Sequence, residues 1–337
     1  MILSTVCRIF GALLLLACGG WAALALLVAG SDADQLRRAL AAGVALLAVA
    51  AAVSLLARWG QAFALPAMAA AFLAVLIWFF GLPAANNRNW TADVAQTPWA
   101  EIAGDSVTIH NVRNFAWRTE TDFTPRWETR TVDLSKLQGV DVVASYWMGD
   151  NIAHLLVSFV FADAPPLAIS IETRKEVGEP YSTVLGFFRR YELVYVVADE
   201  RDLIGVRTNV RADPPEDVYL YHVRAPLDAV RRLFLEYLHQ MNELRTEPEF
   251  YNTATTNCTT MVVINNRVNG PVSLLNWKIL LSGHLPQLIY DRGGLDQTYP
   301  YPELRQRSRV NDAARAAGIE APDFSAKIRA GLPMPPR

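Results

Sequence analysis

A single cysteine in the polar part of the chain is the first candidate for chemistry. Cys258 stands in the stretch Phe-Tyr-Asn-Thr-Ala-Thr-Thr-Asn-Cys-Thr-Thr-Met-Val-Val, residues 250–263. Thr255, Thr256 and Asn257 offer cap oxygens before an apolar run, so we predict that a helix begins at Cys258. The positive end of a helix dipole lowers the pKa of a thiol and favours the nucleophilic thiolate. Cys258 is therefore the candidate nucleophile; the alternative is a small, buried and inert apolar residue.

A cysteine nucleophile needs a base, and the histidines differ in their surroundings. His222 and His239 lie in charged or solvated stretches, and His284 lies in a loop. His110 and His154 lie on predicted strands. His154 is the preferred candidate because of the residue that is expected to face it.

That partner follows from a predicted β-hairpin. Two β-rich runs, 152–161 and 167–171, are separated by Ala-Asp-Ala-Pro-Pro. If the turn centres on Asp163, His154 lies opposite Glu172, and directly opposed Cβ atoms are about 4.5–5.5 Å apart. Glu172 would then orient the imidazole. The alternative is a solvated His and Glu pair at a sheet edge.

Further elements position these residues. Alternation predicts a half-buried strand at 107–112, and the run 191–198 is expected to be another, buried strand. After Pro226, apolar residues at i, i+3, i+4 and i+7 from Leu227 to Leu244 predict an amphipathic helix. A second helix is expected from Cys258 to about Arg267. These mixed elements predict an α+β fold for the polar part of the chain.

The N-terminal part has a different composition. Three apolar runs of 18 or more residues without a charge, 9–30, 40–57 and 62–82, are long enough to cross a membrane. We predict a membrane anchor with three transmembrane helices over residues 1–85. The positive-inside rule does not decide its orientation, since arginines flank both sides. An alternative for the start is a lipobox, Leu-Leu-Ala-Cys, ending at Cys18.

Composition excludes some classes of function. The 337 residues have a formal net charge of −2 and a pI near 6.2, which gives no electrostatic argument for nucleic acid. No His and carboxylate cluster has metal-ligand spacing, so neither a metal nor another cofactor is expected. Cys258 is the one cysteine of the polar part, so no intramolecular disulfide is available there.

Together these residues carry a resemblance. The order of strand histidine, polar residue on the next strand and later Asn-Cys at a helix start is similar to permuted papain-like proteins, the NlpC/P60 and lecithin:retinol acyltransferase group. More closely, the chain resembles the Lnb N-terminal periplasmic domain family over roughly Trp90 to Asp291. The resemblance is carried by Asn111-Val-Arg-Asn-Phe115, Ile152-Ala-His154, Ser170-Ile-Glu-Thr-Arg174, Tyr191-Glu-Leu193, Asp199-Glu-Arg-Asp202, and Tyr251-Asn-Thr with Asn257-Cys-Thr259.

The named member of that family is a bacterial lipoprotein N-acyltransferase, so the resemblance implies acyl transfer through a thioester. It implies Cys258 as nucleophile, His154 as base and Glu172 as orienter. It also implies a bacterial inner-membrane protein whose papain-like domain, residues 89–325, lies in the periplasm. Phospholipid and a lipoprotein or other envelope substrate would be its partners, together with the membrane. The alternatives are a cysteine amidase or peptidase of the cell envelope and a non-catalytic envelope interaction protein.

Supporting roles complete the predictions. The backbone N–H of Cys258, with Tyr251 or Asn257, is expected to stabilise an oxyanion. Three arginines are candidates for a lipid head group, with a solvated surface position as the alternative: Arg113, Arg118 and Arg174. The apolar segment 272–290 is expected either to rest on the membrane surface or to be a core helix. Residues 326–337 are expected to form a loose tail.

Overall fold

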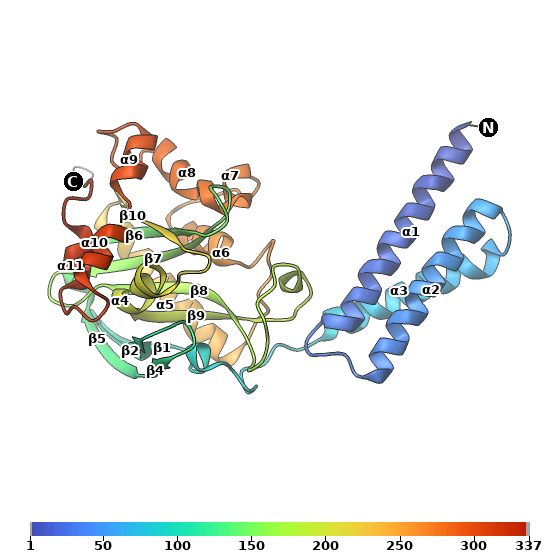
Figure 1. Cartoon of the computed structure of the whole chain (residues 1–337), viewed down its shortest axis with the longest axis horizontal. Helices are drawn as coiled ribbons and strands as arrows, with labels where there is room; N and C mark the ends of the chain where they lie inside the picture. The colour runs from blue at the N-terminus through green and yellow to red at the C-terminus, as the bar shows by residue number, and fades with distance from the viewer. Residues whose placement is uncertain (1, 335–337) are drawn as a thin grey trace. The chain divides into compact units, whose positions relative to one another are not determined.

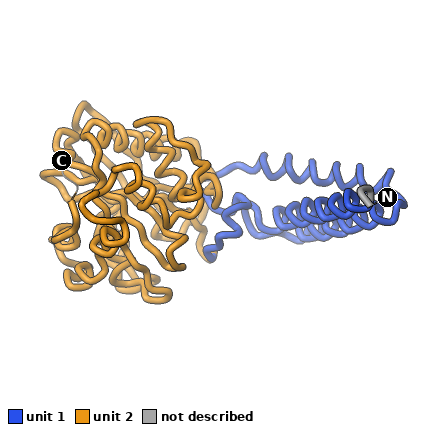
Figure 2. Tube along the Cα trace, turned by 90° about the horizontal axis from the view of Figure 1, so that it is seen from above, with its two compact units in different colours: residues 1–85, 180–192 blue, residues 86–179, 193–337 orange. Residues whose placement is uncertain are grey.

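The structure is a computed structural model that describes residues 2–334 (Figure 1). The chain divides into two compact units (Figure 2): residues 1–85 with 180–192, and residues 86–179 with 193–337. Residue 1 of the predicted anchor and residues 335–337 of the predicted tail lie outside the described residues. The first unit therefore includes a short segment that the sequence places far from the anchor.

Three long helices form most of the first unit: α1 (Ile2–Val28), α2 (Gln35–Ala57) and α3 (Gln61–Gly81). Each is long and apolar enough to cross a membrane, as predicted from the three apolar runs. Asp34 caps α2, because its carboxylate accepts the backbone N–H of Arg37 at 2.8 Å. Gly19 allows α1 to approach α2 closely: a Cβ at this position would lie 2.2 Å from the Cβ of Ala48.

The second unit is built on an eight-stranded sheet with the order β1-β2-β9-β8-β7-β6-β10, in which β5 also pairs with β2. Its strands are β1 (Trp99–Ala103), β2 (Ser106–Arg113), β5 (Trp127–Asp133), β6 (Leu137–Tyr146), β7 (Ala153–Phe161), β8 (Leu167–Arg174), β9 (Glu192–Asp199) and β10 (Asp217–His222). A separate pair consists of β3 (Ala116–Trp117) and β4 (Phe123–Thr124). The fold is thus α+β, as predicted.

The β7–β8 hairpin has the register that was predicted from a turn at Asp163. The paired residues run from Phe159 with Leu167 to Leu156 with Ser170. Continued by two residues, this register places His154 opposite Glu172, just beyond the last pair.

Helices cover both faces of the sheet. On one face, Phe159 of β7 contacts Phe234 of α5 (Leu227–Thr246), with ring centroids 4.8 Å apart. Tyr195 of β9 contacts Tyr237 of the same helix at 5.7 Å. Asn265 of α6 (Cys258–Asn265) donates to the Tyr195 hydroxyl at 3.0 Å, so α6 lies on this face too.

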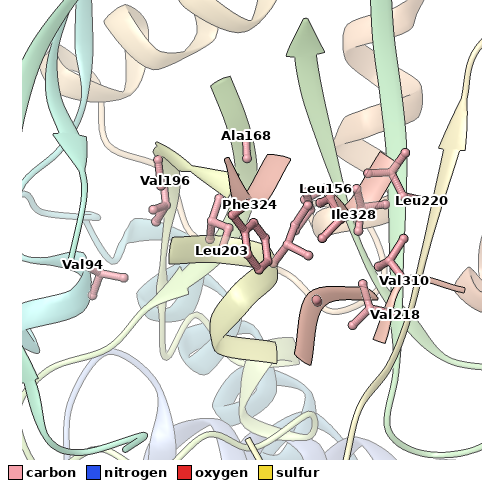
Figure 3. Close-up of a cluster of buried hydrophobic side chains, with 14 of the residues drawn as sticks. Val94, Leu156, Ala168, Val196, Leu203, Val218, Leu220, Val310, Phe324 and Ile328 are labelled. Carbon is pink, nitrogen blue, oxygen red and sulfur yellow. The ribbon is translucent and has the colours of Figure 1, made fainter. Parts of the chain in front are cut away.

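An apolar cluster fills the other face (Figure 3). Side chains from the strands, such as Leu156 and Val196, pack there against α4 (Glu200–Gly205), α10 (Asn311–Ala317) and α11 (Phe324–Arg329).

The remaining helical elements are short. The α-helices are α7 (Trp277–Leu280), α8 (Leu285–Asp291) and α9 (Tyr301–Arg307), and η4 (Val206–Val210) is a π-helix. The 3₁₀ turns are η1 (Ala92–Val94), η2 (Leu134–Lys136), η3 (Leu185–Phe187), η5 (Asn266–Asn269) and η6 (Ser282–His284).

The tail predicted as loose from residue 326 begins inside α11. Phe324 is 1% exposed and Ile328 is fully buried, and both belong to the apolar cluster of Figure 3. Arg329 is held by ion pairs to Asp141 and Glu200. The prediction was wrong up to Arg329, because long-range burial orders a segment whose local composition is weakly structured.

Candidate active site

Cys258 is the first residue of α6, and the start of this helix is capped. The side-chain oxygen of Asn257 accepts the backbone N–H groups of Thr259 and Thr260, each at 2.9 Å. The Thr260 hydroxyl in turn accepts the backbone N–H of Asn257 at 2.9 Å, which completes a capping box. The N–H of Cys258 has no acceptor within its own helix, so it is available at the positive end of the dipole.

His154, Ser170 and Glu172 form a hydrogen-bonded chain on one face of the hairpin. The Ser170 hydroxyl donates to Glu172 Oε1 at 2.6 Å, and its oxygen lies 2.6 Å from Nε2 of His154. Because the single hydroxyl proton is given to Glu172, Nε2–H of His154 is the donor to Ser170. His154 Nε2 also lies 3.2 Å from Glu172 Oε1. The other ring nitrogen, Nδ1, is not used by Ser170 or Glu172.

The thiol of Cys258 meets His154 where β7 and β8 diverge. The ladder between the strands ends at Leu156 with Ser170, and the Cys258 thiol lies near the backbone N–H of Leu155, the next residue of β7, which helps to lower the pKa of the thiol. Cys258 is half-buried, and its thiol and His154 are close enough for each to shift the pKa of the other. The divergence of two paired strands thus makes room for the first residue of α6.

The ionisation of this pair is shifted toward charge. Burial opposes the charged form of His154, but Glu172 and Cys258 together raise its pKa to about 9. Burial likewise opposes ionisation of the Cys258 thiol, and the neighbouring imidazole outweighs it and lowers the pKa of the thiol. A thiolate beside an imidazolium is the activated state of a cysteine nucleophile.

Arg207 supports Glu172 from the π-helix η4. Its side chain is 3% exposed, and Nη2 lies 3.0 Å from Glu172 Oε1, while Nη1 donates to the carbonyl of Leu203 at 2.7 Å. Glu216 lies on the other side of Arg207, with 3.7 Å between Nε and Oε2, and it pairs with Arg211 at 2.6 Å. Burial raises the pKa of Glu172, yet His154 and Arg207 bring it well below its usual value.

Sequence reasoning missed two of these residues. Ser170 shares one face of β8 with Glu172 at a spacing of two, and this alternation was a usable signal. Arg207 had no local signal, because its partner Glu172 is 35 residues away in the sequence.

The predicted oxyanion donors are placed differently. Asn257 uses its side-chain oxygen for the helix cap and donates Nδ2 to the carbonyl of Thr253 at 2.8 Å. It is therefore a structural cap, and the prediction that it stabilises an oxyanion is corrected. Tyr251 is buried in the segment before α6, and its role stays a prediction. The N–H of Cys258 remains a candidate donor.

Two of the three arginines expected to meet a head group are buried. Arg113 is 5% exposed and forms a bidentate ion pair with Asp202, with contacts of 2.8–3.2 Å. Arg174 is 2% exposed, donates to the carbonyls of residues 94 and 95, and stacks on Trp90 at 4.5 Å. Both are corrected to structural residues. Arg118 is exposed beside Asp122, and a head-group contact for it stays a prediction.

The other histidines lie in separate surroundings. Their partners are Glu101 for His110, Asp141 for His222, Glu243 for His239 and Asn151 for His284. Among residues 2–334, no three His, Cys, Asp or Glu side chains are grouped so that they could hold a metal ion. Of the described histidines, His154 is the one next to Cys258.

Comparison with known proteins bears on the same region. Residues 123–283 match the model of the family described as Lnb N-terminal periplasmic domain, and this stretch includes His154, Glu172 and Cys258. No curated protein and no solved structure matches the chain. The three apolar helices before the match fit a membrane protein with a periplasmic domain. Residues 123–283 are therefore similar to the family that the sequence motifs resemble.

Proposed function

We propose that this protein is a membrane-anchored cysteine acyltransferase that acts on phospholipid or lipoprotein acyl groups through a thioester on Cys258. We place it in the bacterial inner membrane with its C-terminal domain in the periplasm. The observation that supports the chemistry is the contact of Cys258 with His154, whose pKa is raised by Glu172. Perturbed ionisation of a nucleophile and its base is typical of catalytic sites. The chain order His154, Glu172, Cys258 is compatible with a permuted papain-like arrangement, which is part of the proposal.

The mechanism follows from the positions of the protons. The Cys258 thiolate attacks the carbonyl carbon of an ester, and the resulting oxyanion accepts the backbone N–H of Cys258. When the tetrahedral intermediate collapses, the imidazolium of His154 protonates the departing alcohol, and a thioester remains on Cys258. An amine then attacks the thioester, and neutral His154 takes its proton while the thiolate leaves. Water in place of the amine gives hydrolysis.

An exposed apolar segment beside the site supports a lipid substrate. Three large side chains of this segment are 55–95% exposed: Leu275, Trp277 and Leu280. The segment is fastened to the start of β7, since Ser282 accepts the backbone N–H of Ala153 at 2.9 Å, one residue before His154. It is not a long core helix, because only the short α7 and α8 form there. Exposed apolar surface next to a thiol suits an acyl chain.

Intact mass spectrometry tests the proposal. The protein is purified with its native lipids as wild type, Cys258→Ala and His154→Ala. We expect a fatty-acyl mass on wild type that hydroxylamine removes and that both variants lack. Cys18→Ala is the matched control, because Cys18 lies in α1 and its loss should leave the adduct in place.

Other outcomes assign other functions. A peptidyl adduct on Cys258 would favour the cysteine amidase or peptidase. No adduct on the wild type, even with added phospholipid, would refute acyl transfer and favour a non-catalytic envelope protein.

A further inference from the structure

The segment that connects β8 to β9 packs with the apolar helices. Residues 180–192 belong to the same compact unit as α1, α2 and α3 (Figure 2). Phe188 is 6% exposed and lies in the apolar cluster of this unit, which also contains Trp21 and Phe79. The rings of Trp21 and Phe188 have centroids 6.1 Å apart. A loop between two strands of the sheet is thus anchored among the membrane-spanning helices.

Arginines of this loop hold the ends of two helices. Arg189 Nη1 donates to the carbonyls of Phe80 at 2.9 Å and Leu82 at 3.2 Å, at the C-terminus of α3. The carbonyl of Arg189 accepts the N–H of Gly30, just after α1, at 2.9 Å. Arg190 pairs with Asp32 at 2.9 Å. Cations at helix C-termini donate hydrogen bonds to carbonyls that lack a partner in the helix, and they interact favourably with the negative end of the helix dipole. These contacts therefore fix the loop where α1 and α3 end.

The loop also presents apolar side chains outward. Tyr181, Val184 and Phe187 are 50%, 56% and 44% exposed. At the same end of the helices, the Arg37 guanidinium lies 5.2 Å from the centre of the Trp78 ring. Aromatic rings and arginines at the ends of spanning helices are typical of the membrane interface. Three exposed large side chains continue that interface from the helices onto the loop.

We propose that residues 180–188 form a membrane-interface loop. Its occupant is phospholipid: Tyr181, Val184 and Phe187 enter the head-group and upper acyl region of the leaflet in which α1 and α3 end. The interface is continuous with that of the spanning helices, because loop and helices belong to one unit. The inference depends on the anchor and is independent of the proposed thiol chemistry.

Spin labelling of the full chain in liposomes tests this depth. The background is Cys7→Ala, Cys18→Ala and Cys258→Ala, with a nitroxide on Val184→Cys or Phe187→Cys. The liposomes contain phosphatidylethanolamine and phosphatidylglycerol, and power saturation compares access of oxygen with access of a water-soluble nickel chelate. Ile102→Cys is the matched control, since Ile102 is 49% exposed on β1 of the other unit. Val184, Phe187 and Ile102 are exposed, so the variants labelled at these positions should fold.

We expect labels at 184 and 187 to be several times more accessible to oxygen than to the chelate, and the label at 102 to show the reverse. Equal access of the chelate at 184, 187 and 102 would overturn the proposal. Spin–spin broadening that disappears on dilution with unlabelled protein would assign the face to a second copy of the chain and would also overturn it. Because Cys258 is absent throughout, a failure of the acyl chemistry does not affect this result.

Discussion

The substitution Glu172→Gln tests how the reactivity of Cys258 is generated. The pKa of His154 is raised from 6.5 to about 9 in the folded protein. At 1.36 kcal/mol for each pKa unit, this rise corresponds to about 3 kcal/mol of stabilisation of the imidazolium. Burial acts in the opposite direction, and the charge of Glu172 is the largest single influence that raises this pKa.

Loss of the Glu172 charge should raise the pKa of the Cys258 thiol. Without the Glu172 carboxylate the pKa of His154 falls, and a neutral imidazole no longer stabilises the thiolate, so the pKa of Cys258 rises. We expect the fraction of Cys258 present as thiolate at pH 7 to fall, by about tenfold for each unit by which the pKa of the thiol rises above 7. The midpoint of thiol reactivity should move to higher pH.

Alkylation by iodoacetamide measures this without knowledge of the substrate. The rate at Cys258 is followed by peptide mass spectrometry from pH 5 to pH 10, for wild type and Glu172→Gln. Glu176→Gln is the matched control, because Glu176 follows the same strand but pairs with Arg88. Circular dichroism verifies that the variants are folded. If wild type and Glu172→Gln have the same midpoint, the carboxylate does not control the pair and the reasoning is refuted.

Three further predictions follow from the same contacts. Asn257→Ala removes the cap of α6, so we expect the free energy of unfolding to fall by about 1 kcal/mol and the alkylation of Cys258 to be slower. Unchanged values for both would contradict the role of the cap. Arg207→Met removes a cation beside the buried Glu172, so we expect about 3–5 kcal/mol of destabilisation in urea unfolding and a smaller loss for Arg207→Lys. A stable Arg207→Met variant with wild-type alkylation of Cys258 would show that Arg207 does not hold Glu172. Phe324→Ala opens a cavity under α11, so we expect about 3–5 kcal/mol of destabilisation by thermal unfolding, whereas the exposed control Asp323→Ala should change stability little. Equal stability of Phe324→Ala and wild type would support the original prediction that the tail is loose.

The parts of the fold that were predicted correctly depend on local pattern. The three spans follow from uninterrupted apolar length, because charge-free runs of this length are typical of membrane-spanning helices. The hairpin register follows from one turn, because a one-residue slip would invert every side chain of β7 and β8. The cap at Asn257 follows from residue type and the apolar run after it. With these three features, the sequence alone placed Cys258, His154 and Glu172 in their elements.

The parts that were missed depend on contacts between distant residues. Arg113 and Arg174 look like surface arginines in sequence, and only the fold shows the buried carboxylate and carbonyls that they bind. Asn114 and Arg201 likewise contact each other across 87 residues. Residues 199–202, within the family match, and residues 111–115, which lie before it, therefore hold the scaffold together. Residues 180–192 have no apolar run of spanning length, so nothing local predicted that they pack with the anchor.

The buried charges around Glu172 are explained better by the chemistry of the site than by the stability of the fold. Burying Arg207 costs desolvation free energy, and replacing a buried ion pair with apolar side chains often leaves stability unchanged or increases it. Arg207 keeps Glu172 ionised, and Glu216 offsets the charge of Arg207 from the other side. An ionised Glu172 stabilises an imidazolium at His154, and that imidazolium stabilises a thiolate at Cys258. An inert cysteine needs no such chain of charges, and this is the physical reason to prefer a nucleophilic Cys258 over a structural one.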